Sequence, residues 1–184
     1  MKQLRKKSME SRRGQSLVEG MVALSVIMVA LLGALSLLSN STALNRVISE
    51  NYLGSYLAAE GIEVVKNILD HNAFSIANGV PGAQWNDDVC AHASGTYEVD
   101  YTTKNLANNR IGPIGVISPK KIRLSPTGEY SYSQDSGYVD TPFTRTISIQ
   151  CEEDVIKVKS EVRWSGRGGS KQNIILEDRF YKWR

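Results

Sequence analysis

A stretch without any charged residue, from Gly20 to Asn45, constrains this chain more than any other feature. Its first part, up to Leu38, consists almost wholly of Ala, Val, Leu, Ile, Met, Gly and Ser. A helix needs about 20 apolar residues to cross a bilayer, so this stretch is long enough to span a membrane. Glu19 stands directly before it, and a carboxylate at the edge of hydrocarbon is costly unless it has a partner. We therefore expect a membrane helix in which Glu19 has a function.

The net charge of the 184-residue chain is +3, but it is unevenly distributed. Residues 1–14 contain six basic side chains and one acidic one, Glu10. Because the whole chain has 22 basic and 19 acidic residues, the other 170 residues carry 16 basic and 18 acidic ones. Basic residues beside an apolar span stay in the cytoplasm, so we expect the chain after residue 45 to be exported. The excess basic charge belongs to a leader, and we predict no nucleic-acid binding from it.

The residues from Arg12 to Glu19, followed by the apolar run, resemble the cleavage site of the type IV pilin and pseudopilin family. The resemblance implies that a prepilin peptidase cuts after Gly14, and that the new terminus, Gln15, is a candidate for N-methylation. It also implies that Glu19, the fifth residue of the mature chain, guides assembly by contacting the amine of a neighbouring subunit. The chain departs from the family pattern at Gln15, where phenylalanine or methionine is usual, and lacks the proline that many members have midway along the helix.

Three other interpretations of the N-terminus compete with this one. A conventional secretory signal has an apolar core of about 7–15 residues, shorter than this one, although Ser41-Thr42-Ala43 is a weak cleavage site. Twin-arginine export would use Arg12-Arg13, but the apolar residues that should follow are missing. An uncleaved single-span anchor explains the apolar run and leaves Gly14 and Glu19 as coincidences.

The helix is predicted to continue beyond the membrane. Apolar residues recur at a spacing of three to four from Leu44 to Leu69, which is typical of an amphipathic helix. Polar residues, Glu60 among them, fall largely on the opposite side, which we expect to face solvent. No proline interrupts residues 15–70. Gly54 and Gly61 each weaken a helix by about 1 kcal/mol, which indicates bending or local melting rather than a break.

The end of this helix is predicted near Asp70–Asn72, with His71 in a capping role. The residues that follow, from Asn78 to Gly82, are rich in turn formers. Residues 72–94 are expected to form a loop over a globular head.

After this loop the apolar pattern changes to a period of two, which indicates strands. The last three predicted strands are joined by short connections and should form an antiparallel meander. Arg145 alternates in phase with Phe143, Ile147 and Ile149. The predicted strands cover 96–101, 121–124 paired with 130–132 around a turn at 125–128, 143–149, 155–164 and 172–183.

These elements predict an α+β fold in which the outer half of a long N-terminal helix packs on a C-terminal antiparallel sheet. The resemblance to pilins implies the same architecture. The predicted segments are a leader at 1–14, a membrane and assembly half-helix at 15–45, an amphipathic half-helix at 46–71, and an exported head at 72–184.

The two cysteines, in an exported domain, favour a disulfide between Cys90 and Cys151 over a catalytic thiol. It would close a loop of about 60 residues and contribute about 2–4 kcal/mol. A metal site at Cys90 and His92, with Asp87 and Asp88, is the weaker alternative because zinc normally takes four well-spaced ligands.

Other polar and aromatic residues carry weaker signals. The oxygen ligands of a calcium ion would come from Asp135, Asp140 and 152–154, but no loop has the spacing of a calcium-binding motif. A binding surface could use the loop 134–142 or aromatic side chains, of which about half, Trp164 especially, should be core. No pattern indicates a nucleophile with its base, a cofactor or a metal, so we expect no enzyme. The aromatic candidates are Tyr130, Tyr132, Tyr138, Trp164, Tyr181 and Trp183.

These observations predict a structural subunit, a minor pilin or pseudopilin, rather than a catalyst. It would enter the inner membrane with its amino terminus inside and later join a filament outside. Its partners would be the prepilin peptidase, the inner-membrane assembly platform, other pilin subunits and the membrane. The alternative is a single-span, membrane-tethered binding domain that forms no filament.

Overall fold

The structure, a computed structural model, describes residues 7–91, 94–115, 119–166 and 169–182, with side chains from residue 15 onward. The chain divides into two compact units, one up to Ile48 and one from Ser49. Helix α1 (Lys7–Ala77) contributes to both. The predicted long N-terminal helix is therefore confirmed, and it begins before Gln15.

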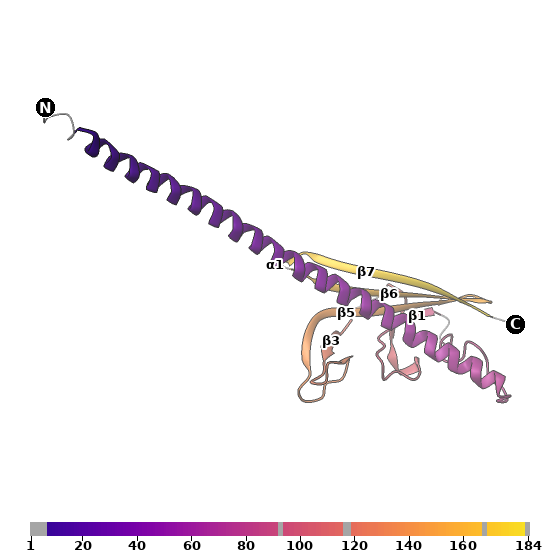
Figure 1. The fold of residues 1–184 in the computed structure, drawn as a ribbon. Coiled ribbons are helices and arrows are strands. Elements are labelled where there is room, and N and C mark those ends of the chain that lie inside the picture. Colours follow the sequence, from indigo (N-terminus) through magenta and orange to yellow (C-terminus); the bar gives the residue numbers. More distant parts are fainter. Residues whose placement is uncertain (1–6, 92–93, 116–118, 167–168, 183–184) are drawn as a thin grey trace, which may run out of the picture. The chain divides into compact units, whose positions relative to one another are not determined.

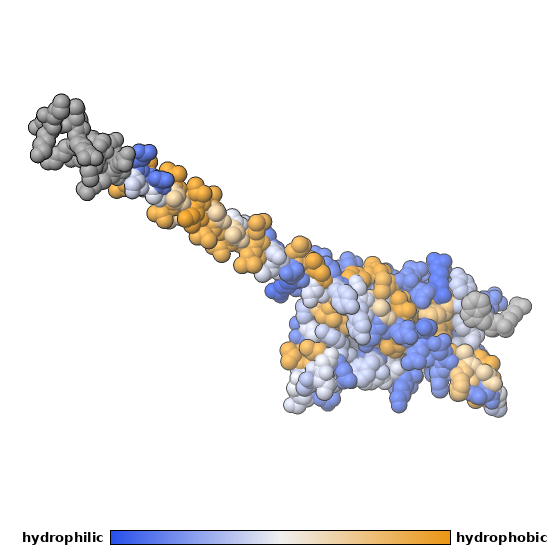
Figure 2. Space-filling model, viewed as in Figure 1, coloured by the Kyte–Doolittle hydropathy of each residue, from blue (hydrophilic) through white to orange (hydrophobic). Residues whose placement is uncertain are grey.

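In the first unit, every described side chain is exposed. The large apolar side chains between Leu17 and Ile48 are each 50–72% exposed, and Figure 2 shows the resulting apolar surface along the helix. The helix is long and apolar enough to cross a membrane, and none of its most apolar stretch is buried. This exposure distinguishes it from the core helix of a soluble protein.

The C-terminal end of α1 is closed by Gly79, which has a left-handed backbone (φ +70°). The Gly79 N–H donates to the carbonyl of Ile76 (2.9 Å), and the Val80 N–H donates to that of Ser75 (3.1 Å). These two bonds form a Schellman motif, the usual arrangement when glycine follows a helix. The helix accordingly ends at Ala77.

The predicted end near Asp70–Asn72 was wrong. Asn72 is buried inside the helix, and its Nδ2 donates to the carbonyls of Trp85 (3.3 Å) and Asp87 (2.8 Å). Its polarity thus holds the following loop against α1 and does not terminate the helix. His71, expected to cap the helix, is exposed within it because α1 continues to the Gly79 turn.

The head contains a seven-stranded sheet in which every pairing between described strands is antiparallel. The central strand β5 pairs with β6 along one edge, and β6 pairs with β7. Along its other edge, β5 pairs with β1 near one end and with β3 near the other. The strands are β1 (Ser94–Tyr97), β2 (Arg110–Gly112), β3 (Lys121–Leu124), β4 (Tyr130–Ser131), β5 (Val139–Cys151), β6 (Val155–Ser165) and β7 (Lys171–Tyr181), with a short 3-10 helix at Ala107–Asn109.

The α+β class, the β5–β6–β7 meander and the β3–β4 hairpin are confirmed. The strand predicted at 96–101 is wrong in its extent because β1 ends at Tyr97. Residues 98–100 remain buried, and the Asp100 carboxylate binds groups from other segments. Strand β2 was not predicted, since its three residues carry no alternation. Trp183, in the last predicted strand, lies outside the described residues.

Within the head, one face of α1 packs along the sheet (Figure 1). Burial of these side chains supplies the main stabilisation of the head, at about 25 cal/mol for each Å² of apolar surface removed from water. One cluster contains Val65, Ile68, Leu69, Val89, Tyr97, Val99, Leu106, Ile147, Ile149, Ile156 and Val158; the other contains Leu57, Ala58, Ile122, Phe143, Val162 and Trp164.

The two helix glycines are points of close approach between α1 and the sheet. A Cβ on Gly54 would lie 2.9 Å from Trp164 Cζ3. A Cβ on Gly61 would lie 2.5 Å from Ile147 Cδ1 and 2.9 Å from Ser160 Oγ. The expected local melting is absent, because α1 is helical through both positions. A side chain at either position would therefore require the neighbouring side chains of the sheet to shift.

Gly61→Ala is therefore expected to destabilise the head. Overpacking costs about 1–3 kcal/mol, whereas alanine improves helix propensity by up to about 1 kcal/mol. Urea unfolding of the full chain in detergent measures the difference. Gly33→Ala is the matched control, because no atom lies within 4 Å of its Cβ position. A Gly61→Ala protein more stable than the parent would contradict the close approach.

Candidate functional site

The residues predicted to direct processing and assembly all lie on α1. The helix begins at Lys7 and therefore passes through the peptide bond between Gly14 and Gln15. Gln15 and Glu19 are four residues apart, which places them one turn from each other on the same helix face. Both side chains are exposed.

Glu19 stands on an apolar surface. Its neighbours Leu17, Val18, Met21 and Val22 are 57–65% exposed. Among the residues whose side chains the structure describes, none forms a hydrogen bond or ion pair with the Glu19 carboxylate. In hydrocarbon, a carboxylate in such surroundings needs a cation or donor from outside this part of the chain.

The predicted disulfide is confirmed. Cys90 and Cys151 are bonded; their Cα atoms are 5.9 Å apart and their sequence separation is 61. The bond ties the loop after α1 to the end of β5. A cysteine held in a disulfide cannot act as a thiolate ligand, which removes Cys90 from the metal alternative.

Cys90→Ser is expected to lower the free energy of unfolding by about 2–4 kcal/mol under oxidising conditions. The disulfide restricts the conformations of the unfolded chain. Without it the unfolded state has a higher conformational entropy, which favours unfolding. Chemical denaturation of both proteins, with and without a reductant, measures the effect. The difference should largely vanish in reductant; equal stability under oxidising conditions would show that the bond contributes nothing.

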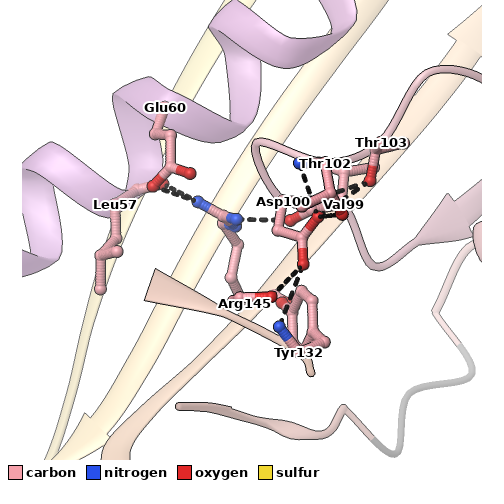
Figure 3. A network of polar contacts seen from close by, with 9 residues as sticks. Leu57, Glu60, Val99, Asp100, Thr102, Thr103, Tyr132 and Arg145 are labelled. Carbon is pink, nitrogen blue, oxygen red and sulfur yellow. Dashed lines mark hydrogen bonds and ion pairs between the residues drawn. The ribbon is translucent and has the colours of Figure 1, made fainter. Parts of the chain in front are cut away.

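The charged side chain of Arg145 lies inside the head, on β5, at a position that alternates in phase with apolar residues. Arg145 is 1% exposed. Its Nη1 donates to the Leu57 carbonyl on α1 (2.8 Å) and forms an ion pair with Glu60 Oε2 (3.2 Å). Its Nη2 donates to the carbonyl of Val99 (Figure 3). One guanidinium thus joins the helix, the central strand and the segment after β1.

The polar cluster continues through Tyr132 and Asp100 (Figure 3). The Tyr132 hydroxyl donates to the Arg145 carbonyl (3.1 Å), and burial raises the pKa of this tyrosine to about 12. The Asp100 carboxylate accepts from Ser131 Oγ (2.8 Å), Tyr132 N (3.0 Å) and Thr102 Oγ1 (2.6 Å). These groups bind one another, so the arrangement fastens segments of the head together.

Burial raises the pKa of Asp100, but hydrogen bonds from Thr102, Tyr132 and Ser131 outweigh it, so the pKa lies below its usual value. Because the folded-state pKa is below the unfolded value of about 3.9, ionised Asp100 contributes stability above that pH. This contribution is lost as the pH falls through the lowered folded-state pKa.

We therefore expect the head to lose stability on acidification below about pH 4. Asp100→Asn should be less stable at neutral pH and should depend less on pH in the acid range. Thermal unfolding between neutral and acid pH tests this, with the exposed Asp88→Asn as control. An unchanged acid dependence in Asp100→Asn would rule out Asp100 as its source.

The aromatic candidates lie in different environments. Trp164 is core, as predicted, with its ring centroid 5.4 Å from that of Phe143. Tyr130, Tyr132 and Tyr138 are half-buried, and Tyr181 is 50% exposed. The aromatic residues therefore do not form a single exposed surface among the described residues.

The polar loop predicted at 134–142 is partly strand, because β5 begins at Val139. Arg123 holds the loop: its Nη1 and Nη2 donate to the carbonyls of Ser133 (3.2 Å) and Tyr138 (2.8 Å). Its Nε also pairs with Asp140 (2.9 Å). Asp140 is thus engaged in an ion pair.

Across the described part of the chain, no three His, Cys, Asp or Glu residues are grouped so that they could hold a metal ion. Of the residues named for a metal site, His92 lies outside the described residues. Asp87 accepts the Gln84 N–H (2.6 Å), and Glu152 pairs with Lys157.

Arg145 and Glu60 were the residues whose importance was missed from the sequence. The signal was present, because an arginine alternated in phase with Phe143 and Ile147. Its partner was hidden by periodicity, since Glu60 was assigned to the solvent face of α1, and its side chain is only 20% exposed.

Comparison of the chain with protein-family models, curated proteins and solved structures finds no match. The class that the fold defines is an α+β protein with a long apolar N-terminal helix, able to cross a membrane, and a disulfide-bonded head.

Proposed function

We propose that this protein is a structural subunit of a type IV pilus or a related pseudopilus, most similar in role to a minor pilin. It enters the inner membrane as a prepilin, with its amino terminus inside and its head outside. The prepilin peptidase cleaves it after Gly14, and Gln15 becomes the mature terminus and the candidate for N-methylation. The assembly platform then moves its apolar helix from lipid into a bundle with other subunits.

One observation carries this proposal: an apolar helix with its side chains exposed and Glu19 at its start. Lipid tails and neighbouring helices are similarly apolar, so burial alone does not drive the helix out of the membrane. Packing and polar contacts must decide, and the only acidic residue between Gln15 and Asn45 is Glu19. Cleavage after Gly14 would create an amine on each subunit, four residues from Glu19. This amine would pair with the Glu19 carboxylate of a neighbouring subunit.

The rest of the chain supports a structural role. The buried polar cluster of Arg145, Tyr132 and Asp100 joins α1 to the sheet and to neighbouring segments of the head. We infer no catalysis and no cofactor from them. The alternative is a membrane-tethered binding domain, which needs the same helix and leaves Glu19 without a partner.

The test is incorporation into filaments. A tagged full-length chain is expressed in a bacterium with a type IV pilus or pseudopilus, with and without its assembly-platform protein. The chain should appear in sheared filaments only when the platform is present. If it stays in the membrane in both strains, tethering is the better description.

A further inference from the structure

A cavity of about 580 Å³ opens where β3, β5, β6 and β7 lie side by side. Its walls include Lys121, Thr144, Arg163 and Asn173, which are consecutive cross-strand neighbours in the sheet. Successive residues of a strand face opposite sides, and Phe143 and Val162 pack in the core with α1. The row therefore lies on the face of the sheet away from α1.

Arg163 is already neutralised in this cavity. Its Nε and Nη2 donate to the Glu161 carboxylate at 2.8 and 2.9 Å, and Asn173 Nδ2 donates to the same carboxylate (3.3 Å). Burial raises the pKa of Glu161, but the bonds from Arg163 and Asn173 outweigh it and keep the pKa low. This pair carries no net charge.

Two other cations, Lys121 and Lys171, line the same cavity and have no acidic partner among the described residues. The adjoining hollow, which shares Lys121, differs because its other cations are paired: Lys120 with Glu98 (3.6 Å) and Arg123 with Asp140 (2.9 Å). The uncompensated positive charge of these two hollows therefore comes from Lys121 and Lys171.

We propose that this cavity binds an anionic saccharide, a sugar unit that carries a carboxylate. The two ammonium groups would pair with the carboxylate. The Ser165 hydroxyl and the Asn173 amide oxygen, which also line the cavity on this face of the sheet, would bond with sugar hydroxyls. The volume is in the range of small-molecule sites, about 300–1,000 Å³.

The same features argue against a nucleic acid. Binding a polynucleotide requires many phosphate contacts, whereas this cavity has two uncompensated cations. Base stacking needs an exposed ring, and Trp164, the aromatic residue in the lining, is 4% exposed. The carboxylate of one sugar unit therefore matches the two cations of the cavity better than a polynucleotide does.

Binding of polygalacturonate, a carboxylated polysaccharide, to the full chain in detergent tests the proposal. Lys121→Gln/Lys171→Gln should weaken binding about tenfold, because each exposed ion pair contributes at most about 1 kcal/mol. The charge-matched control is Lys104→Gln/Lys182→Gln, at exposed positions outside the cavity, which should bind like the parent. Unfolding midpoints confirm that all three proteins are folded.

Uncharged dextran and duplex DNA provide the comparison ligands. Weak or no binding to either, with the loss confined to the cavity variant, supports the proposal. No binding to polygalacturonate, an equal loss in both variants, or DNA binding with the same dependence on Lys121 and Lys171 overturns it. Because the test requires neither cleavage nor filaments, its failure leaves the proposed pilin function standing, and the reverse also holds.

Discussion

Replacing Arg145 with alanine is expected to destabilise the head by about 3–5 kcal/mol. Arg145 supplies the partner of Glu60 and donates to the carbonyls of Leu57 and Val99. Alanine would leave the partly buried Glu60 carboxylate and the carbonyls of Leu57 and Val99 without this donor. It would also create a cavity under α1. Since a domain is stable by about 5–15 kcal/mol, this single change removes a large share of the total.

Chemical denaturation of the full chain, followed by circular dichroism, measures this effect. The control is Arg179→Ala, which removes an exposed arginine from β7 whose partner, Glu177, is also exposed, and which should cost at most about 1 kcal/mol. A double-mutant cycle with Glu60→Gln should give a coupling energy above about 0.5 kcal/mol, because the two side chains are in contact. A loss below that of Arg179→Ala would show that the buried cluster does not hold α1 to the sheet.

Glu19→Ala is expected to block incorporation into filaments while membrane insertion and cleavage after Gly14 remain largely intact. The carboxylate lies on an exposed apolar face, and no described side chain binds it. In the proposed assembly its partner is the amine of a neighbour, so alanine and the isosteric Glu19→Gln should both fail. A buried charge that loses its partner costs about 3–5 kcal/mol, enough to prevent assembly.

Sheared filaments and membranes from cells expressing each variant are compared by immunoblotting. Ser25→Ala is the control, because Ser25 lies further along the same exposed helix and its hydroxyl bonds within the helix (2.8 Å to the Met21 carbonyl). Incorporation of Glu19→Ala at the level of the parent would leave the filament proposal without its main support.

Local patterns predicted most of the fold. The charge-free run and the three-to-four spacing located α1, and alternation located β5, β6 and β7. The pairing of Cys90 with Cys151 followed from there being two cysteines in a chain expected to be exported. In each case the property belongs to the segment itself, so it can be detected without knowing what the segment contacts.

Tertiary contacts decided the features that were missed. Asn72 looked like a helix end and is held inside α1 by the carbonyls of Trp85 and Asp87. Gly61 looked like a weak point and is the place where Ile147 approaches the helix. Glu60 looked solvent-facing and pairs with a buried arginine 85 positions away. None of these partners can be identified from periodicity.

The most direct measurement is the N-terminal residue of the mature protein, by mass spectrometry of the membrane and sheared-surface fractions. The pilin proposal predicts a chain that starts at Gln15, with or without a methyl group. A chain that starts at Met1 would indicate an uncleaved anchor, and one that starts near Leu44 a secreted domain. Either of these results would contradict prepilin processing.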